Sequence, residues 1–382
     1  SEQIKTFDSK DKIFVGELSL DGSLRSINGS LNITILAKRK GIKKIFLPET
    51  NAQEAATISD IEVIPVCNLN QLIEHLEGIK IISPQSPTVI QPTRPPFSVS
   101  LSEIKGQGAA KRALMIAASG GHNLIMVGPP GTGKTMLAQA IISILPLPTK
   151  SECLEITQIW SASGLNQNTS FINYRPFRSP HHSSSAVALI GGGSNPRPGE
   201  ISLAHRGVLF LDEIPEFHRD VLEALRQPLE NGKIHIARSK KSLTFPAKFQ
   251  LIAAMNPCPC GYFEDPEKEC RCTAYEILRY QKKISGPLLD RIDIQLEVPR
   301  IPIEELRKTE NKGETDSFQD QIIAARKIQE ERFSKFEPKI YCNAEMSSKL
   351  SEQFVKLDKS ADAFLKQILE KSFMSARGYF RL

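Results

Sequence analysis

The sequence lacks the features that would place the protein in a membrane or outside the cell. No apolar run approaches the ~20 residues that a membrane-spanning helix needs. The first residues, Ser-Glu-Gln-Ile-Lys, show no signal-peptide pattern. A strong excess of one charge is missing too, because the formal net charge is +6, which permits a nucleic-acid partner without requiring one. We therefore expect a cytoplasmic protein with no membrane partner.

A disulfide framework is also missing. The chain has seven Cys, which is an odd number, and three of them are scattered. The other four form two C-x-C pairs separated by a short acidic loop: Cys258 with Cys260, and Cys270 with Cys272. This pattern fits a reducing cytoplasm, and four thiolates at this spacing could close a tetrahedral, structural Zn²⁺ site. Zinc ribbons ordinarily use C-x₂-C, so free thiols and a redox pair stay open as alternatives.

The length and the segment pattern predict several domains. A chain of 382 residues exceeds one ordinary domain, and 40% apolar residues are enough to bury more than one core. Residues 1–82 have the short apolar runs and helical patterns of a small α/β unit, and the Pro-rich stretch 83–99 indicates a linker. Residues 100–300 alternate helix and strand, which predicts a doubly wound parallel sheet. Residues 301–382 are charged and helix-rich, and we predict a helical lid there.

A phosphate-binding motif lies between a predicted strand, residues 123–127, and a predicted helix, residues 136–145. Its glycines let backbone N–H groups turn toward phosphate oxygens, and the helix N-terminus adds a favourable dipole. Lys134 is expected to reach the β- and γ-phosphates of ATP, and the Thr135 hydroxyl is expected to bind Mg²⁺. The residues that fill the G-x-x-x-x-G-K-[ST] pattern are Gly128, Pro129, Pro130, Gly131, Thr132, Gly133, Lys134 and Thr135.

Polar residues follow two further apolar strands. Asp212 and Glu213 come directly after residues 208–211, where Asp212 is placed to hold Mg²⁺ and Glu213 to polarise the attacking water. Acids also cap strand ends without a catalytic role, but phosphoryl transfer needs a metal and a positioned water, which favours the catalytic interpretation. Asn256 follows residues 251–254 and is predicted to hydrogen-bond the γ-phosphate or the water; the alternative is a turn-forming Asn.

Two arginines are candidates for the transition-state charge. Arg291 lies beside apolar residues at a predicted domain edge, where it could reach the phosphates held by a neighbouring subunit. The alternative is a structural Arg paired with Asp290 or Asp293. Arg377 lies at the start of a predicted lid helix and is expected to contact the γ-phosphate; the alternative is a solvated side chain.

Two segments interrupt the α/β pattern and are candidates for contact with DNA. The first runs from about Arg175 to Arg206 and carries His181 and His182, which could be metal ligands, DNA contacts or packing residues; we predict DNA contacts. The second, residues 233–245, alternates on both sides of a basic tip and predicts a β-hairpin. Such a tip would hold phosphates without reading sequence, although a Lys/Arg run is ordinarily a solvated loop. The basic residues of the tip are Arg238, Lys240 and Lys241.

Long stretches of the chain resemble the magnesium-chelatase-like AAA+ group, and most closely the bacterial ComM/YifB family. The resemblance implies an AAA+ P-loop core with a helical lid, in a hexameric ATPase that binds single-stranded and branched DNA in its channel. It implies branch migration during natural transformation, with recombination proteins as further partners. By this pattern Lys134 and Thr135 belong to Walker A, Asp212 and Glu213 to Walker B, Asn256 is sensor 1, Arg291 the arginine finger and Arg377 sensor 2, and both insertions face the channel. The matching stretches are residues 175–182, 191–193, 196–205, 209–215, 255–261 and 286–291.

The N-terminal residues resemble the second half of a Lon-type protease domain, in residues 16–24 and 46–49. The position of the Lon dyad Lys corresponds to Leu31, and the half that would hold the nucleophilic Ser is not present. Because a Ser without an activating base is a poor nucleophile, we predict a non-proteolytic assembly or docking element.

A second function stays open at this level. A chelatase-type or protein-remodelling ATPase that acts on a polypeptide would share the fold and the ATP chemistry of a DNA translocase. The basic hairpin tip is the feature that favours DNA.

Overall fold

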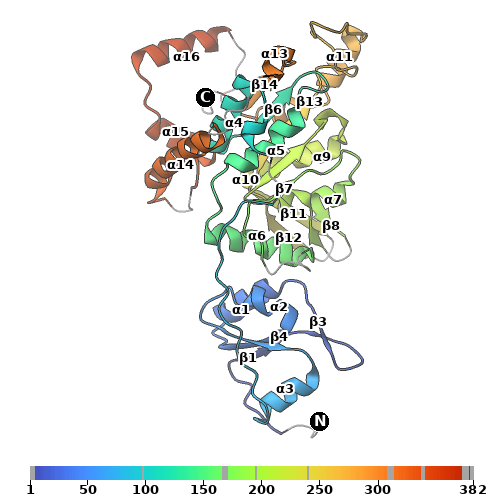
Figure 1. Ribbon diagram of the computed structural model, residues 1–382, viewed down its shortest axis with the longest axis vertical. Helices are drawn as coiled ribbons and strands as arrows, with labels where there is room; N and C mark the ends of the chain where they lie inside the picture. Colours follow the sequence, from blue (N-terminus) through green and yellow to red (C-terminus); the bar gives the residue numbers. More distant parts are fainter. Residues whose placement is uncertain are drawn as a thin grey trace. The chain divides into compact units, whose positions relative to one another are not determined.

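The computed structural model describes residues 5–96, 99–165, 171–193, 196–238, 241–307, 314–336, 340–371 and 378 (Figure 1). Lys240 and Arg377, two of the predicted site residues, lie outside this set. The chain forms two compact units. The first comprises Ser1–Thr93, Leu147–Tyr174 and Gly192–Gly199, and the second comprises Arg94–Pro146, Arg175–Gly191 and Glu200–Leu382.

The first unit is built on a small parallel sheet with the strand order β1-β4-β5. Alternate side chains of β4 point to opposite faces, so Ile45 and Leu47 enter one apolar cluster and Phe46 enters another. The elements of this unit are β1 (Lys12–Phe14), β4 (Lys44–Pro48), β5 (Glu62–Val66), a two-stranded sheet of β2 (Glu17–Leu18) and β3 (Leu24–Arg25), α1 (Ser30–Arg39), α2 (Glu49–Ala55), α3 (Leu69–Leu76) and α6 (Lys150–Ser163).

A buried carboxyl group lies between the helices of the first unit. Glu54 of α2 is 5% exposed, and it accepts a hydrogen bond of 2.8 Å from the Ser30 hydroxyl of α1. Burial raises the pKa of Glu54, although hydrogen bonds from Ser161, Ser30 and the backbone of Leu31 oppose this rise. Leu31, the residue after Ser30, is fully buried as well. Glu54 therefore links helices in the interior of the first unit through hydrogen bonds.

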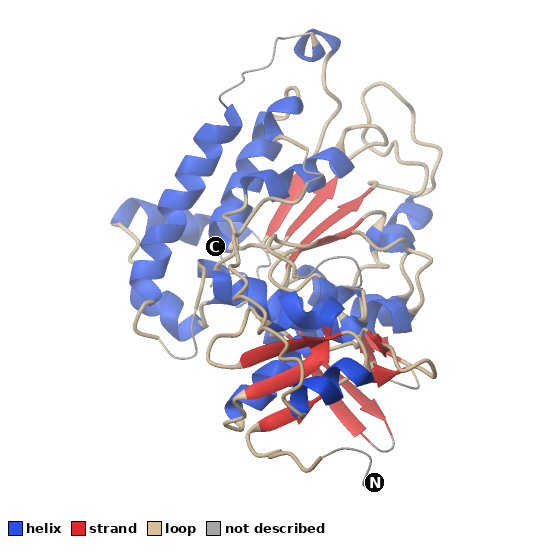
Figure 2. Ribbon diagram, turned by 60° about the horizontal axis from the view of Figure 1, so that its bottom comes forward, coloured by secondary structure: helices blue, strands red, loops and turns tan. Residues whose placement is uncertain are grey.

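The second unit is built on a five-stranded parallel sheet with the order β14-β6-β13-β10-β7. Every residue of β10 and β13 is buried, which explains why residues 208–211 and 251–255 are continuous apolar runs: a parallel sheet is covered on both faces. Figure 2 shows its strands side by side, with helices against the sheet. The predicted α/β fold with a parallel sheet is confirmed. The strands are β6 (Leu124–Val127), β7 (Phe177–Arg178), β10 (Val208–Leu211), β13 (Gln250–Met255) and β14 (Ile294–Glu297).

Two apolar clusters cover the two faces of this sheet. One joins Phe210 and Ile252 to the helices α4 and α5, against which α14 also packs, and the other joins Leu209 and Leu251 to α9 and the hairpin. The helices are α4 (Gly108–Gly120), α5 (Lys134–Ile144), α7 (Ala186–Ile190), α8 (Glu200–Leu203), α9 (Arg219–Ala224), α10 (Arg226–Asn231), α11 (Ala274–Gln281), α12 (Gly286–Leu289), α13 (Ile303–Leu306), α14 (Glu314–Phe333), α15 (Ser348–Phe354) and α16 (Lys359–Lys371), with the 3₁₀ turns η1 (Leu101–Glu103), η2 (Ile214–Glu216) and η3 (Asn343–Glu345).

The predicted hairpin is present. β11 (Lys233–Arg238) and β12 (Lys241–Pro246) pair antiparallel from Lys233 opposite Pro246 to Arg238 opposite Lys241. Two further short strands are β8 (Gly191–Gly192) and β9 (Arg197–Pro198). Within the part of the chain that the structure describes, none of the helices has the length and apolar character of a membrane span.

Candidate nucleotide site and nucleic-acid interface

The loop of residues 128–133 joins β6 to α5 and depends on glycine in two different ways. Gly131 and Gly133 have φ angles of +79° and +84°, a region that side chains disfavour. Gly128 is needed for space instead, because a Cβ there would lie 2.2 Å from the carbonyl oxygen of Val298. Gly133 also begins α5 without a side-chain cap, so the first N–H groups of this helix are available to an anion. This loop has the form of a phosphate cradle.

The ammonium group of Lys134 is held inside this loop. Its Nζ donates hydrogen bonds to the carbonyl oxygens of Gly128 (2.7 Å) and Pro129 (2.8 Å) and to Oδ1 of Asn256 (3.3 Å). Burial lowers the pKa of Lys134, while the carboxylates of Asp212 and Glu213 oppose this effect. Lys134 and Asn256 therefore meet at one edge of the sheet, because β6 and β13 are parallel neighbours.

The oxygen ligands expected for Mg²⁺ lie beside Lys134. The hydroxyl of Thr135 donates to Oδ2 of Asp212 over 2.8 Å, so the two oxygens face one point. A hydroxyl and a carboxylate are hard ligands of the kind that Mg²⁺ prefers, and Mg²⁺ ordinarily completes its shell with phosphate oxygens and water. The donor set present here therefore fits this ion.

Glu213 has a constrained backbone and a half-exposed side chain. Its φ is +49°, in the left-handed region, and its N–H donates to Oδ1 of Asp212 over 2.9 Å. Its Oε2 lies 3.6 Å from Nδ1 of His182. The His182 ring in turn lies against the ring of His181, tilted by 34° at 4.1 Å between centroids, and meets Phe217 edge-on. His182, predicted from the sequence to contact DNA, is thus placed beside the acid predicted to activate water.

Arg291 lies against its own chain. Its guanidinium donates to Oε2 of Glu230 (2.7 Å) and to the carbonyl oxygen of Pro287 (2.6 Å). Asp293, one of the two acids considered as its partner, is 3.1 Å from Nδ1 of His122. The side chain of Arg291 is 12% exposed.

The hairpin has one packed face and one polar face at its base. Ile234 and Ile236 are buried in the core of the second unit, whereas His235 is exposed and hydrogen-bonded to Thr244 over 2.7 Å. The backbone register places Arg238 opposite Lys241 at the tip. The side chains of these two residues lie outside the described part of the structure.

The four clustered cysteines converge. The Sγ atom of Cys258 lies 3.4 Å from that of Cys260 and 3.7 Å from that of Cys270, and Cys260 and Cys270 are 3.6 Å apart. One sulfur from each of the four residues falls within 4.8 Å of every other. The backbone N–H of Tyr262 is the main cause that lowers the pKa of the Cys260 thiol to about 6. Such a group could hold a metal ion.

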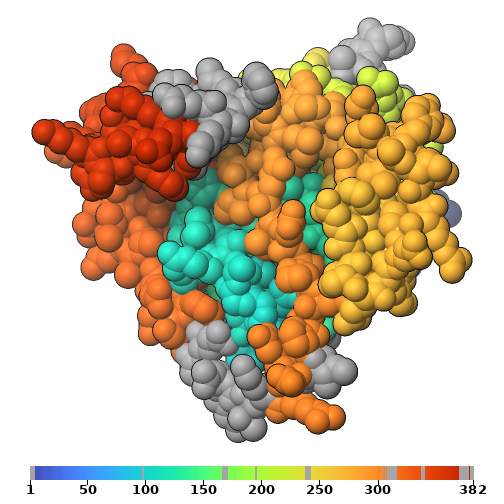
Figure 3. Space-filling model, turned by 90° about the horizontal axis from the view of Figure 1, so that it is seen from above, coloured from blue at the N-terminus to red at the C-terminus, as the bar shows by residue number. Residues whose placement is uncertain are grey.

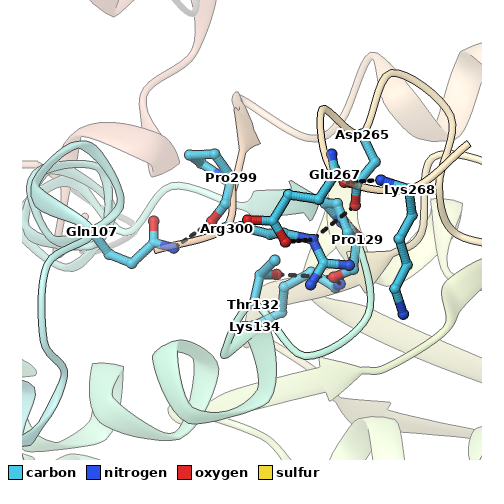
Figure 4. Close-up of polar contacts among 10 residues, drawn as sticks. Gln107, Pro129, Thr132, Lys134, Asp265, Glu267, Lys268, Pro299 and Arg300 are labelled. Carbon is cyan, nitrogen blue, oxygen red and sulfur yellow. Dashed lines mark hydrogen bonds and ion pairs between the residues drawn. The ribbon is translucent and has the colours of Figure 1, made fainter. Parts of the chain in front are cut away.

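A polar network beside the loop was missed by reasoning from the sequence. The amide of Gln107 donates to the carbonyl oxygen of Pro299 over 2.8 Å, and Nε of Arg300 lies 2.9 Å from Oδ2 of Asp265 (Figure 4). Figure 3 shows this end of the second unit, where the cyan residues near 110 lie beside orange residues near 300. The partners are far apart in the sequence, so no local pattern could have paired them.

Comparison with known families gives matches along most of the chain. The family described as magnesium chelatase, subunit ChlI, matches residues 100–306. Its C-terminal part, described as magnesium chelatase, subunit ChlI C-terminal, matches residues 312–382, and the profile described as subunit ChlI of Mg-chelatase matches residues 1–51.

Individual relatives extend these matches to the full chain. Competence protein ComM of Haemophilus influenzae is 42% identical over 387 aligned residues, which cover 100% of this chain and 74% of that protein. The YifB protein of Escherichia coli is 41% identical over 383 residues with the same two shares. A weaker similarity of 31% over 103 residues, 24% of this chain and 13% of the relative, links it to the Lon protease of Brucella suis.

Proposed function

Because the chain belongs to the magnesium-chelatase-like family of AAA+ ATPases that includes competence protein ComM, we propose that it is an ATP-dependent DNA helicase and translocase. Its proposed role is to promote branch migration while incoming DNA is integrated during natural transformation. The proposed working form is a homohexamer.

One observation carries the ATPase part of this proposal: polar groups from three adjacent parallel strands meet at one sheet edge. Lys134 bonds to Asn256, and Thr135 bonds to Asp212, across separations of 122 and 77 residues. Ligands bind at the carboxyl ends of strands in open parallel sheets, which is where these groups lie. Bound Mg²⁺ would neutralise charge on the transferred phosphoryl group.

The residues at this edge would divide the work of hydrolysis. Lys134 would leave the loop carbonyls to bind phosphate oxygens, and the N–H groups at the start of α5 would hold the same phosphates. Glu213, beside Asp212, would orient the attacking water and accept its proton. Asn256 would hydrogen-bond the γ-phosphate or that water.

Assembly would complete the site. Arg291 would exchange Glu230 of its own chain for the phosphates bound by the neighbouring subunit, where its fixed charge stabilises the transition state. Arg377, outside the described residues, is proposed to add a second positive charge from the helical lid. Hydrolysis would then depend on the ring.

The nucleic-acid part of the proposal rests on the hairpin. A two-stranded element anchored by Ile234 and Ile236 would present Arg238, Lys240 and Lys241 to DNA phosphates. His181 and His182 would lie close enough to the catalytic acid to relate DNA binding to hydrolysis.

Two further parts of the proposal are structural. The four-cysteine cluster is proposed to hold Zn²⁺, and the Lon-like N-terminal residues are proposed to serve in assembly or docking without proteolysis. The domain division proposed from the sequence is a Lon-like part (1–82), a linker (83–99), an AAA+ core (100–300) and a lid (301–382).

The experiment that tests the proposal compares four activities: ATP turnover with and without DNA, assembly, DNA binding and unwinding of branched DNA. The double variant Lys240→Ala/Lys241→Ala should weaken DNA binding and flatten its salt dependence, while turnover without DNA stays the same. The matched control is Lys349→Ala/Lys356→Ala, which removes the same charge from exposed positions of the C-terminal region. Unwinding that survives Lys134→Ala, or turnover that a solitary subunit carries out regardless of DNA, would refute the proposal.

A chelatase-type or protein-remodelling ATPase is the second candidate, because the matching family is described by the magnesium chelatase subunit. The two candidates differ in what stimulates hydrolysis. Stimulation by single-stranded DNA favours the helicase, and stimulation only by a polypeptide partner favours the alternative.

A further inference from the structure

The loop that follows β13 has almost no means to hold its own shape. Residues 258–272 carry five charged side chains among the six residues Glu264 to Glu269, and few apolar ones. A segment of this composition buries too little apolar surface to offset the entropy of ordering it. Its structure must therefore be fixed by ties at particular points.

The strongest of these points is the four-cysteine cluster. We propose that Cys258, Cys260, Cys270 and Cys272 bind one Zn²⁺ ion, which joins the two ends of this loop and braces the P-loop beside it. The role given to the ion rests on the proposed ATP site, whereas its presence does not.

The distances between the sulfurs fit a tetrahedral metal ion. A tetrahedral ion with Zn–S bonds of ~2.3 Å separates its sulfurs by about 3.8 Å. The separations of 3.4, 3.6 and 3.7 Å are close to this value. They are far above the ~2.05 Å of a disulfide bond. Four sulfurs within 4.8 Å of one another would repel each other as thiolates, and a bound cation would offset this repulsion.

The loop is pressed against the phosphate-binding loop. Gly261 has a φ of +85°, and a Cβ at this residue would lie 2.7 Å from the ring of Pro130. Cys258 comes two residues after Asn256, whose amide oxygen accepts the hydrogen bond from Lys134. An ion that holds Cys258 and Cys260 in place would therefore also hold the backbone that packs against Pro130 and follows Asn256.

A second tie joins the same loop to the strand on the other side of β6. Asp265 is fully buried at its side chain and pairs with Arg300 at 2.9 Å, close after β14 (Figure 4). Arg300 and Lys268 also lie over the ring of Tyr262, at 5.9 and 4.9 Å from its centroid. With the ion in place, the loop is held at its ends and at its middle.

Metal content is the first measurement. The full chain should be purified without chelators and without an affinity tag that binds metals. Inductively coupled plasma mass spectrometry should then find about one zinc ion per chain. Cys270→Ser should lose this zinc, whereas Cys67→Ser, which changes an exposed cysteine of the first unit, should keep it. Substoichiometric metal in the wild-type protein, or full zinc in Cys270→Ser, would overturn the site.

The second measurement tests whether the ion stabilises the P-loop. Removing zinc with a chelator, and restoring it, should raise and then lower the KM for ATP roughly tenfold, because small displacements at a binding site have effects of this size. If Cys270→Ser does not fold, Cys272→Ser and reversible chelation of the wild type provide the same comparison, with circular dichroism to confirm folding. An unchanged KM in the folded, zinc-free protein would reject the bracing role. A wild-type protein that contains zinc but does not hydrolyse ATP would instead count against the proposed function alone.

Discussion

The protein contains two parallel sheets whose carboxyl edges differ completely. In the first unit, β4 ends at Pro48 and α2 begins at the next residue, Glu49, so no loop is left between them. In the second unit, residues 128–133 separate β6 from α5 and form an open loop. Such a loop lets consecutive backbone N–H groups surround an anion.

The side chains at the two edges differ as well. At the edge of the small sheet, the Cys67 thiol donates to the Glu49 carboxylate over 3.0 Å, and this contact is the main cause that raises the pKa of Cys67. An acid and a neutral thiol offer nothing to a phosphate. The large sheet places Lys134, a hydroxyl and acids together. Buried apolar strands thus build both sheets, but only the residues after the strands make one of them a candidate site.

The largest expected effect separates the two sheets directly. Lys134→Ala should reduce ATP turnover by roughly 100-fold or more, because it removes the cation aimed at the phosphates. Lys44→Ala, which removes a lysine from β4 of the small sheet, should leave turnover unchanged. Steady-state hydrolysis assays measure both, and equal losses in the two variants would contradict the distinction.

The next effect separates binding from chemistry at the large sheet. Glu213→Gln keeps the size of the side chain but removes its ability to accept a proton, so turnover should fall by about 100-fold while ATP affinity is retained. Its counterpart is Glu49→Gln at the edge of the small sheet, which should change neither quantity. Nucleotide binding followed by calorimetry tests this, and a Glu213→Gln protein with normal turnover would exclude Glu213 as the base.

A smaller effect is expected from the insertion that reaches this edge. His182→Ala should lower kcat roughly threefold to tenfold with KM unchanged, because the imidazole restricts the half-exposed carboxylate of Glu213. His235→Ala, assayed without DNA, is the matched control, since the Nδ1 of His235 bonds to Thr244 of the hairpin instead. A rise in kcat in His182→Ala would show that the histidine holds Glu213 away from its working position.

The smallest effect concerns the stability of the first unit. Burial raises the pKa of Glu54 above its value of 4.5 in the unfolded chain, so the folded state favours the protonated form. The stability that protonated Glu54 contributes is therefore fully present below the unfolded pKa of 4.5, and it is lost as pH rises through the folded pKa. Glu54→Gln should remove this loss and stabilise the unit at neutral pH by roughly 1 kcal/mol.

Thermal unfolding of the full chain at pH 5 and pH 8 measures this difference, with exposed Glu17→Gln as the control. If wild type and Glu54→Gln lose the same stability between these two pH values, Glu54 is not the group responsible.

Local patterns in the sequence carried much of the fold. The apolar runs at residues 208–211 and 251–254 fall within β10 and β13, and the alternating residues 233–238 and 241–245 form the strands of the hairpin. A strand or a turn depends on residues within a few positions of one another, so the local sequence pattern predicts it. The P-loop motif is local for the same reason.

The partners of the site residues were decided only by the tertiary structure. The placement of β13 between β6 and β10 brings Asn256 to Lys134, and the path of an insertion brings His182 to Glu213. The contacts of Arg291 with Glu230 and of Arg300 with Asp265 have the same origin. Composition and spacing determined which chemical groups the protein possesses. Strand order, which no short segment encodes, determined which of those groups meet.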